Sequence, residues 1–461
     1  MARIPKLLPV ALVATLTLCA EPPSRAYAQT SAVAQASAPA QLDAAARKEV
    51  VDNLEALLVR HYVDADTGKL IAANIAKRFA AGAYERMTNP YEFAEAVTTD
   101  LRAINGDKHL MMLYDPRQPA MRVGPEGLRM LGGSGGPGRR EPSPAMIAQA
   151  RRSHFGLARV DILPGNIGYV EIRGFSGSPE AQDAVVAALQ YVQYADALIF
   201  DLRRNGGGSA ELVNFIISHF TGPDTLASLT VKNRSGGETF TRYTLAKVPG
   251  PRRTDVPLYV LTSGYTASAG EDFSFVLKNL GRATIVGEPT AGAGHNNAFL
   301  DTGHGFGTSI SFTRVMDPKS GAEWERIGVQ PTVRVDQGKA LETAEVLALK
   351  QIAAKETDAE DREYSDRLRE SIEAQLTPVN VPAATLASCA GEYEGGRRVW
   401  VENGQLLLSL RPGAPADTLV PLGDGRFALG AMRILFEGTG SAAKMRITRV
   451  GAGTLSYAKV K

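Results

Sequence analysis

The stretch VPLYVLTSGYTASAGEDFSFVLKNL (residues 256–280) joins a short apolar run to a longer helical pattern. Its first part, VPLYVLT, is almost continuously apolar and ends at Thr262, which is typical of a strand buried on both faces. From Ser268 onward, apolar residues recur at helical spacing. The stretch therefore predicts a buried strand, a turn of small residues, and a helix that begins near Ser268.

The same alternation of strand and helix patterns extends to both sides of this stretch. Short apolar strands separated by helices predict an α/β domain with a largely parallel sheet that helices cover on both faces. We place this domain at residues 155–338. The expected strands are IGYVEI (167–172), ALIFDL (197–202), VPLYVLT (256–262), ATIVGE (283–288) and GTSISFTRV (307–315), and the expected helices are AQDAVVAALQYV (181–192), ELVNFIISHF (211–220) and SAGEDFSFVLKNL (268–280).

Four further segments flank this domain. Residues 42–114 have helical periodicity and predict an N-terminal helical domain, and residues 115–154 contain GGSGGPGRREP, which predicts a linker without helix or strand. Residues 339–379 are charged and helical and predict a connector. Residues 380–461 contain strand patterns around Asn403-Gly404, a strong hairpin signal, and predict a small all-β domain.

The N-terminus carries a targeting signal. Residues 1–28 combine Arg3 and Lys6 with the apolar run LLPVALVATLTLCA and an A-x-A site that ends at Ala28. We expect cleavage after Ala28 and export to the periplasm or the medium, with lipid attachment at Cys19 as the alternative. No other run is long enough to span a membrane, so we expect no stable membrane insertion after cleavage.

The composition excludes several classes of protein and partner. The chain has 461 residues, 44% of them apolar, which is enough for several domains with cores of their own. Its 51 basic and 49 acidic residues nearly cancel, which argues against nucleic acid as a partner. Cleavage after Ala28 would leave Cys389 as the single cysteine, so the exported protein would form no internal disulfide.

Ser268 is the first candidate for chemistry. A serine at the start of a helix places its hydroxyl beside free backbone amides, beginning with that of Ala269, which can stabilise an oxyanion. The competing interpretation is purely structural. Serine is a preferred N-cap, and Glu271 three residues later completes a capping box.

The second candidate is the glycine run in IFDLRRNGGGS (199–209). Consecutive glycines allow backbone geometries that expose amides, so Gly207, with Gly208 as second choice, could form half of an oxyanion hole. A phosphate-binding loop does not fit, because no lysine follows the glycines and the spacing matches neither phosphate motif. A tight turn between strand and helix is the structural alternative.

Read together, DLRRNGGGS, TASAGEDF, GEPTAGAG (287–294) and EWERIGVQPT (323–332) resemble the tail-specific or C-terminal processing serine peptidase family. The chain is most similar to the branch that contains the tricorn protease core and the interphotoreceptor retinoid-binding protein modules. The four motifs occur in the order of the family.

This resemblance implies a catalytic triad. In the branch to which the chain is most similar, a glutamate precedes a G-V-x-P segment, which matches Glu325, and a histidine lies in a turn that matches NGDKHL (105–110) at His109. Histidine would accept the proton of Ser268, and the carboxylate would orient the ring. The other branch uses a lysine about 25 residues after the serine. That position is Ala293, and the nearest lysine, Lys278, lies within the predicted helix.

Alternatives to two of these assignments stay open. His295 and His304 both lie in glycine-rich loops near GEPTAGAG and rival His109 as the base. Glu323 is a close neighbour of Glu325. The remaining histidines are expected to be structural or exposed.

The resemblance also implies a crotonase-like core and an exported serine peptidase that acts on peptides or unfolded proteins. The opening CAGEYEG of the C-terminal segment resembles lipocalin-like extensions. The segment between His109 and the first core strand is too short for the usual PDZ domain. We expect no metal and no organic cofactor. A ligand-binding module on the same fold, or an esterase with the same triad, are the alternative functions.

Overall fold

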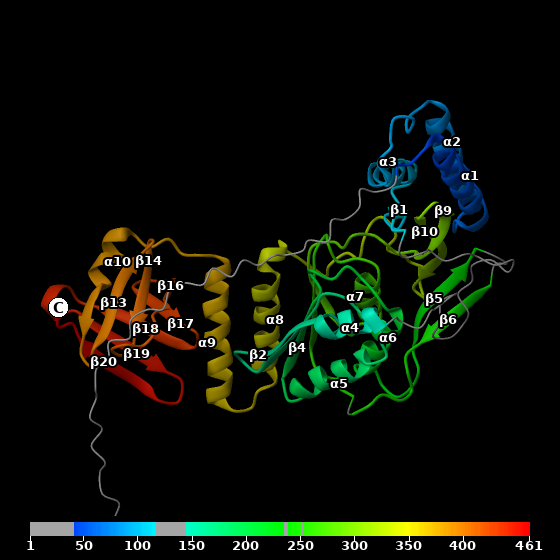
Figure 1. Ribbon diagram of the computed structural model, residues 1–461. Coiled ribbons are helices and arrows are strands. Elements are labelled where there is room, and N and C mark those ends of the chain that lie inside the picture. Colours follow the sequence, from blue (N-terminus) through cyan, green and yellow to red (C-terminus); the bar gives the residue numbers. More distant parts are fainter. Residues whose placement is uncertain (1–40, 117–143, 235–237, 251) are drawn as a thin grey trace, which may run out of the picture. The chain divides into compact units, whose positions relative to one another are not determined.

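The computed structural model describes residues 41–116, 144–234, 238–250 and 252–461 (Figure 1). The expected signal sequence, residues 1–28, and most of the glycine-rich segment 115–154 therefore lie outside the described residues. Residues Gln41–Lys461 group into one compact unit. None of the helices in the described ranges combines the length and apolarity that a membrane span needs.

A six-stranded sheet forms the centre of the α/β region, in the order β11-β8-β7-β4-β3-β2. Adjacent strands from β3 to β11 are parallel, and only β2 is antiparallel to its neighbour. This confirms the expected parallel sheet. The strands are β2 (Leu157–Leu163), β3 (Ile167–Ile172), β4 (Ala197–Asp201), β7 (Leu258–Thr262), β8 (Thr284–Gly287) and β11 (Val333–Arg334).

Helices cover both faces of this sheet, as the near-continuous apolar strands predict. Leu198 and Phe200 of β4 belong to the core beneath α5 (Ala181–Tyr191), α6 (Ala210–Ser218) and α7 (Ala269–Asn279). Ala197 and Ile199 point to the opposite face, as alternation along a strand requires, and join the core with α8 (Ala340–Lys355) and α9 (Ala359–Leu376). The expected connector 339–379 thus covers one face of the sheet.

A second sheet is antiparallel, in the order β1-β10-β5-β6, with β9 also paired to β10. Residues 307–315 were expected in the central sheet, and this expectation is wrong: they belong to β10. Neither β1, which lies at the end of the segment expected to be helical, nor β5, β6 and β9 are predicted from the sequence. The strands are β1 (Met111–Tyr114), β5 (Ala227–Asn233), β6 (Thr239–Tyr243), β9 (Asn296–Gly303) and β10 (Phe306–Met316).

Three helices precede the second sheet and share a core with it. Each begins at a side chain that accepts a hydrogen bond from the first turn: Asp43, Asp64 and Asn89. The helices are α1 (Ala44–His61), α2 (Ala65–Ala80) and α3 (Pro90–Arg102). Val50, Leu54 and Phe93 pack with Ile310 and Phe312 of β10, so the predicted helical segment also covers strands of the second sheet.

The expectation of no helix in 115–154 is wrong at its C-terminal end, where residues Pro144–Arg152 form α4. Proline suits the first turn of a helix, and the alanine, methionine and arginine residues that follow favour helix.

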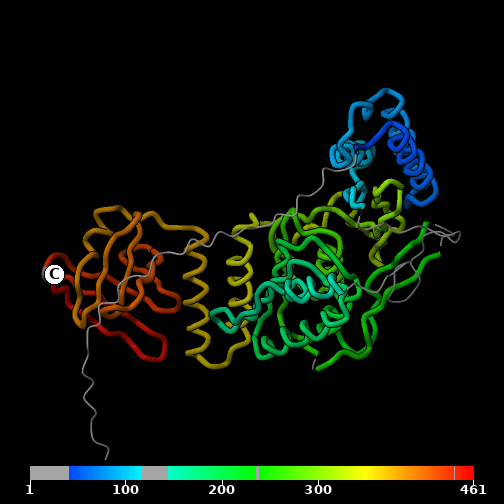
Figure 2. Tube along the Cα trace, viewed as in Figure 1, coloured from blue at the N-terminus to red at the C-terminus, as the bar shows by residue number. Residues whose placement is uncertain are grey.

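The C-terminal segment contains two antiparallel sheets with a core of their own. The predicted hairpin is confirmed: Glu402 pairs with Gln405, and Asn403 and Gly404 adopt positive φ, as a two-residue turn requires. Figure 2 shows these strands, coloured orange to red, following one another along the chain. The elements are α10 (Ala383–Cys389), β12 (Gly391–Tyr393), β13 (Arg397–Glu402), β14 (Gln405–Ser409), β15 (Asp417–Thr418), β16 (Val420–Gly423), β17 (Arg426–Leu429), β18 (Met432–Glu437), β19 (Lys444–Arg449) and β20 (Gly453–Ala458).

Candidate active site

Ser268 lies in the turn between β7 and α7, with φ 53° and ψ −118°. Positive φ is uncommon outside glycine and strains the backbone, and such strain clusters at functional sites. The helix begins at the next residue, so the positive end of its dipole lies beside the serine. A strained serine between a buried strand and a helix is the arrangement of a nucleophile elbow.

Hydrogen bonds tie this turn to the glycine run after β4. Thr266 donates its hydroxyl to the carbonyl oxygen of Leu202 at 2.7 Å, and the Ala267 amide donates to the carbonyl of Asn205 at 3.0 Å. Because β4 and β7 are parallel neighbours, their carboxyl ends meet at one edge of the sheet. The two stretches singled out in the sequence therefore lie together.

The glycine run approaches Ser268 closely. A Cβ added to Gly207, which has φ +112°, would lie 2.8 Å from Cβ of Ser268. The Gly207 amide already donates to Oδ1 of Asn205 at 2.8 Å. The amides of Gly208 and Ala269, in contrast, donate to no acceptor in the described part of the chain. This favours Gly208 over Gly207 as the partner of Ala269 in an oxyanion hole.

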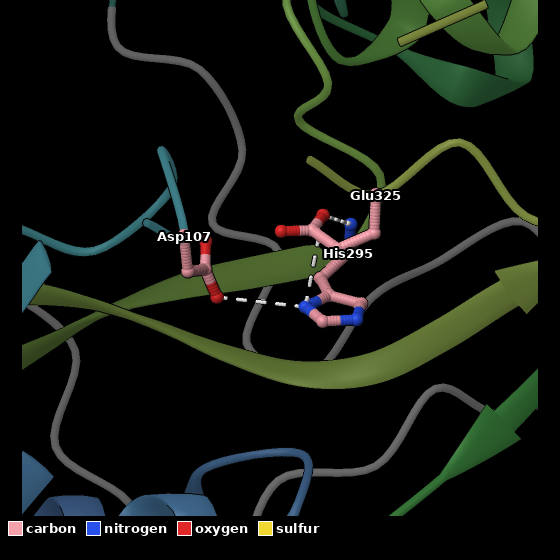
Figure 3. Close-up of side chains that lie close together, drawn as sticks. All are labelled: Asp107, His295 and Glu325. Atoms are coloured by element: carbon pink, nitrogen blue, oxygen red, sulfur yellow. Dashed lines mark hydrogen bonds and ion pairs between the residues drawn. The ribbon is translucent and has the colours of Figure 1, made fainter. Parts of the chain in front are cut away.

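His295 lies between two carboxylates (Figure 3). Its Nδ1 lies 3.4 Å from Oδ2 of Asp107 and 3.8 Å from Oε2 of Glu325. The other ring nitrogen points away from both carboxylates in Figure 3. A carboxylate at Nδ1 fixes the tautomer that leaves Nε2 free to accept a proton.

Asp107 organises the turn that carries His109. Its Oδ1 accepts the His109 amide at 2.9 Å, and its Oδ2 accepts the Tyr62 hydroxyl at 2.9 Å. Burial opposes ionisation of this carboxyl, but the hydrogen bond and charge of His295 prevail and lower the pKa of Asp107 to about 2. Asp107 is therefore a charged, fully buried group beside both histidines.

His109 is partly buried. Its Nδ1 is buried and has no hydrogen-bond partner in the described residues. Burial, and secondarily the nearby His295 and Arg102, lower the pKa of His109 to about 4 against the opposing charge of Asp107. No hydrogen bond joins His109 to Glu325 or Ser268 within the described ranges.

Glu325 is held in place from the loop before β9. Its Oε2 accepts the amides of Gly294 at 2.7 Å and His295 at 3.1 Å. Burial raises the pKa of Glu325, while His295 favours its charged form. The next residue, Arg326, has φ 67°, so the segment turns sharply after the glutamate.

The rival residues have other contacts. Glu323 forms an ion pair with Arg314, and His304 contacts Glu49 at 2.9 Å. The ammonium group of Lys278 donates to the Gln330 carbonyl at 2.7 Å from the last turn of α7. These contacts give Lys278 a structural role away from the serine.

Glu271 does more than cap a helix, which is all that the sequence indicated. Its carboxylate is fully buried and accepts the Ser268 amide at 2.9 Å and the Thr290 hydroxyl at 2.5 Å. It also accepts the amides of Gly292 at 2.6 Å and Ala293 at 2.8 Å. Glu271 thus joins the serine turn to the loop that leads into His295.

A cavity of about 980 Å³ brings several of these groups to one surface. Ser268, Ala269 and Gly208 line it together with His295, whereas His109 and Glu325 do not. Its volume lies at the upper end of the range for ligand sites. The cavity can therefore hold a sizeable substrate against the serine.

One group of described residues also has metal-binding spacing. The donor atoms of Asp107, His295 and Glu325 all lie within 4.8 Å of one another. The hydrogen bond from the imidazole to Asp107, together with the close contact between His295 and Glu325, accounts for the same spacing. The expectation of a metal-free, cofactor-free site stays a prediction.

Two family models match the chain. Residues 166–335 match peptidase family S41, and residues 30–153 match the N-terminal domain of Peptidase_S41 in eukaryotic IRBP. The first match contains Ser268, the glycine run, His295 and Glu325, and the second contains His109.

Each individual relative matches less of the chain than the two family models do together. A carboxyl-terminal-processing protease of Synechocystis is 32% identical over 180 residues, 38% of this chain and 40% of the relative. The carboxy-terminal processing protease CtpB of Bacillus subtilis is 25% identical over 37% of this chain and 34% of the relative. The chain thus spans about two fifths or less of these curated relatives.

Similar solved structures include a lipoprotein from Streptococcus agalactiae, with a TM-score of 0.44 and 16% identity over 66% of this chain and 96% of the other. The photosystem II D1 C-terminal processing protease has a TM-score of 0.38 and 19% identity over 63% and 93%.

Proposed function

Because residues 166–335 belong to peptidase family S41, with the family's N-terminal domain before them, we propose that this protein is an exported serine peptidase. It hydrolyses peptide bonds of peptides or unfolded proteins through an acyl-enzyme. The observation that carries the proposal is the strained Ser268 between β7 and α7, in one cavity with Gly208, Ala269 and His295.

In the first half of the reaction, Ser268 Oγ attacks the scissile carbonyl carbon and its proton passes to a histidine. The amides of Ala269 and Gly208 donate to the oxyanion, and Gly207 is the alternative donor. The histidine then protonates the leaving amine, which leaves an acyl group on Ser268. In the second half, water attacks this ester with the same histidine as base. The bond between the acyl carbon and Ser268 Oγ then breaks, the histidine returns its proton to Oγ, and the new carboxylic acid leaves.

Two histidines are candidates for the base. The family resemblance assigns His109, which Asp107 positions through its backbone amide. The contacts favour His295, because it lies beside Glu325, directs Nε2 away from the carboxylates and lines the cavity with Ser268. Glu325 orients the ring if His295 is the base. The resemblance gives Glu325 the same role toward His109, although no hydrogen bond joins these two side chains in the described ranges.

Kinetics of three alanine variants test the proposal and choose the base. Ser268→Ala should abolish peptide cleavage and leave the thermal midpoint nearly unchanged. Replacing the true base should cost as much, because triad members act as a unit, while replacing the other histidine costs much less. Ser153→Ala, which removes an exposed hydroxyl between α4 and β2, is the matched control and should keep full activity.

The alternatives give other results. A ligand-binding module would retain affinity in Ser268→Ala and cleave nothing. An esterase would hydrolyse activated esters at Ser268 and leave denatured proteins intact.

Export and architecture complete the proposal. Intact mass should show Gln29 as the first residue of the exported protein, and a lipid on Cys19 would contradict this. The proposed core is crotonase-like, and the proposed domain of residues 380–461 is lipocalin-like. The other proposed domain limits are those predicted from the sequence.

A further inference from the structure

One wall of the cavity beside Ser268 is apolar. Its side chains come from α6, from the hairpin β5–β6, from β10 and from the segment before Glu325. All but Phe240 are buried to at least nine tenths, and Phe240 is partly buried. The wall consists of Phe215, Leu229, Val231, Phe240, Val315 and Trp324.

A charged pair lies in this cavity one helical turn from the serine. Asp272 follows Ser268 by four residues on α7, so both residues lie on the same side of the helix. Two nitrogens of Arg242 on β6 each donate to one carboxylate oxygen of Asp272 at 2.7 Å. Nε of Arg242 donates to the Ser228 hydroxyl at 3.0 Å.

Because this pairing is bidentate, Arg242 and Asp272 together add no net charge to the cavity. The side chains of Arg242 and Asp272 are only 17% and 8% exposed, so water screens the pair weakly. The other acidic or basic residues that line the cavity are Glu211 in the first turn of α6 and His295. A charged side chain of the substrate placed against the wall would lose its hydration. It would gain no ion pair in return, because Arg242 and Asp272 are already paired with each other.

We propose that this wall is the binding pocket for a bulky apolar side chain, such as leucine or phenylalanine, on the acyl side of the scissile bond. The inference rests on the proposed function and names its substrate class. Asp272 acts as a specificity residue because it cancels the charge of Arg242. The volume of about 980 Å³ accommodates this side chain together with neighbouring substrate residues.

The test compares kcat/KM for peptides that differ only at this substrate position. We expect Leu and Phe peptides to exceed Asp, Glu and Lys peptides by on the order of 100-fold. Asp272→Asn leaves Arg242 unpaired and should raise the Asp-to-Leu ratio at least about tenfold. Asp161→Asn is the matched control, since it breaks the exposed pair of Arg159 and Asp161 outside the cavity, and should leave the ratio unchanged.

Phe240→Ala gives a second test that leaves the ion pair intact. It should lower kcat/KM for the Phe peptide more than for an Ala peptide. A wild-type preference for charged residues, an Asp-to-Leu ratio unaltered in folded Asp272→Asn, or an equal loss for both peptides in Phe240→Ala would each overturn the inference.

A serine-directed phosphonate separates this failure from that of the proposed function. Labelled Ser268 without an apolar preference overturns the pocket assignment alone. A native protein that is neither labelled at Ser268 nor able to cleave any peptide overturns both.

Discussion

The backbone amide of Ser268 donates a 2.9 Å hydrogen bond to the carboxylate of Glu271, three residues later in the chain. The same carboxylate accepts three further hydrogen bonds from the loop at residues 290–293. One fully buried side chain therefore fixes both the serine turn and the approach to His295.

Glu271→Ala should destabilise the protein strongly, because it leaves three amides and a hydroxyl without an acceptor. At about 1–3 kcal/mol for each unsatisfied buried group, partly relieved by water, we expect a loss of about 3 kcal/mol or more in urea unfolding. Glu373→Ala, on the surface of α9, is the control. A loss below about 1 kcal/mol in Glu271→Ala would show that the network contributes little.

Gly207→Ala should reduce activity because the new Cβ would lie 2.8 Å from Cβ of Ser268, at a φ of +112°. We expect a loss in kcat of at least about 100-fold, which corresponds to about 2.7 kcal/mol. Gly206→Ala is the matched neighbour, because its nearest contact is 3.6 Å away at the Tyr265 hydroxyl. Equal activity in both variants would mean that the backbone at Gly207 can shift to make room for a side chain without disturbing Ser268.

Acid should destabilise the protein partly through His109. Burial lowers its folded pKa from 6.5 to about 4, so the unfolded chain takes up a proton in this window while the folded chain does not. Stability is therefore lost as the pH falls from 6.5 toward 4, by about 3 kcal/mol for this group at 1.36 kcal/mol per unit. His109→Gln should remove that part of the loss in chemical unfolding at pH 7 and pH 4.

His61 is a matched control for this measurement. Burial also lowers its pKa to about 4, but it lies at the end of α1. His61→Gln should reduce the acid loss while retaining activity. If His109 is the base, the acid limb of kcat/KM lies near pH 4. A pH dependence of stability unchanged in His109→Gln would contradict the buried, neutral state of this ring.

Deleting residues 380–461 should leave a folded and active remainder. The C-terminal segment has its own core, from Leu386 to Tyr457, and its polar contacts with α9 include the ion pair between Arg433 and Glu370. Such surface pairs contribute about 0–1 kcal/mol. A truncated protein that loses cooperative unfolding would show that this segment completes the core.

The sequence predicts the parallel sheet well because buried strands and amphipathic helices have distinct apolar periods. It predicts the second sheet poorly, since β5 mixes buried and exposed residues and no residue of β6 is fully buried. Ser268 and the glycine run are recognisable because both follow apolar strands. The sequence does not distinguish His109 from His295 as the base. The two histidines are far apart in the sequence, and their loops come together only in the folded protein, where Asp107 contacts both.

The most direct measurement is labelling of the native protein with a serine-directed phosphonate, followed by peptide mapping of the adduct. The account predicts one adduct per chain, on Ser268, that is absent in Ser268→Ala and after heat denaturation. A native protein that forms no adduct, or one whose adduct lies on another serine, would contradict the claim that Ser268 is the nucleophile.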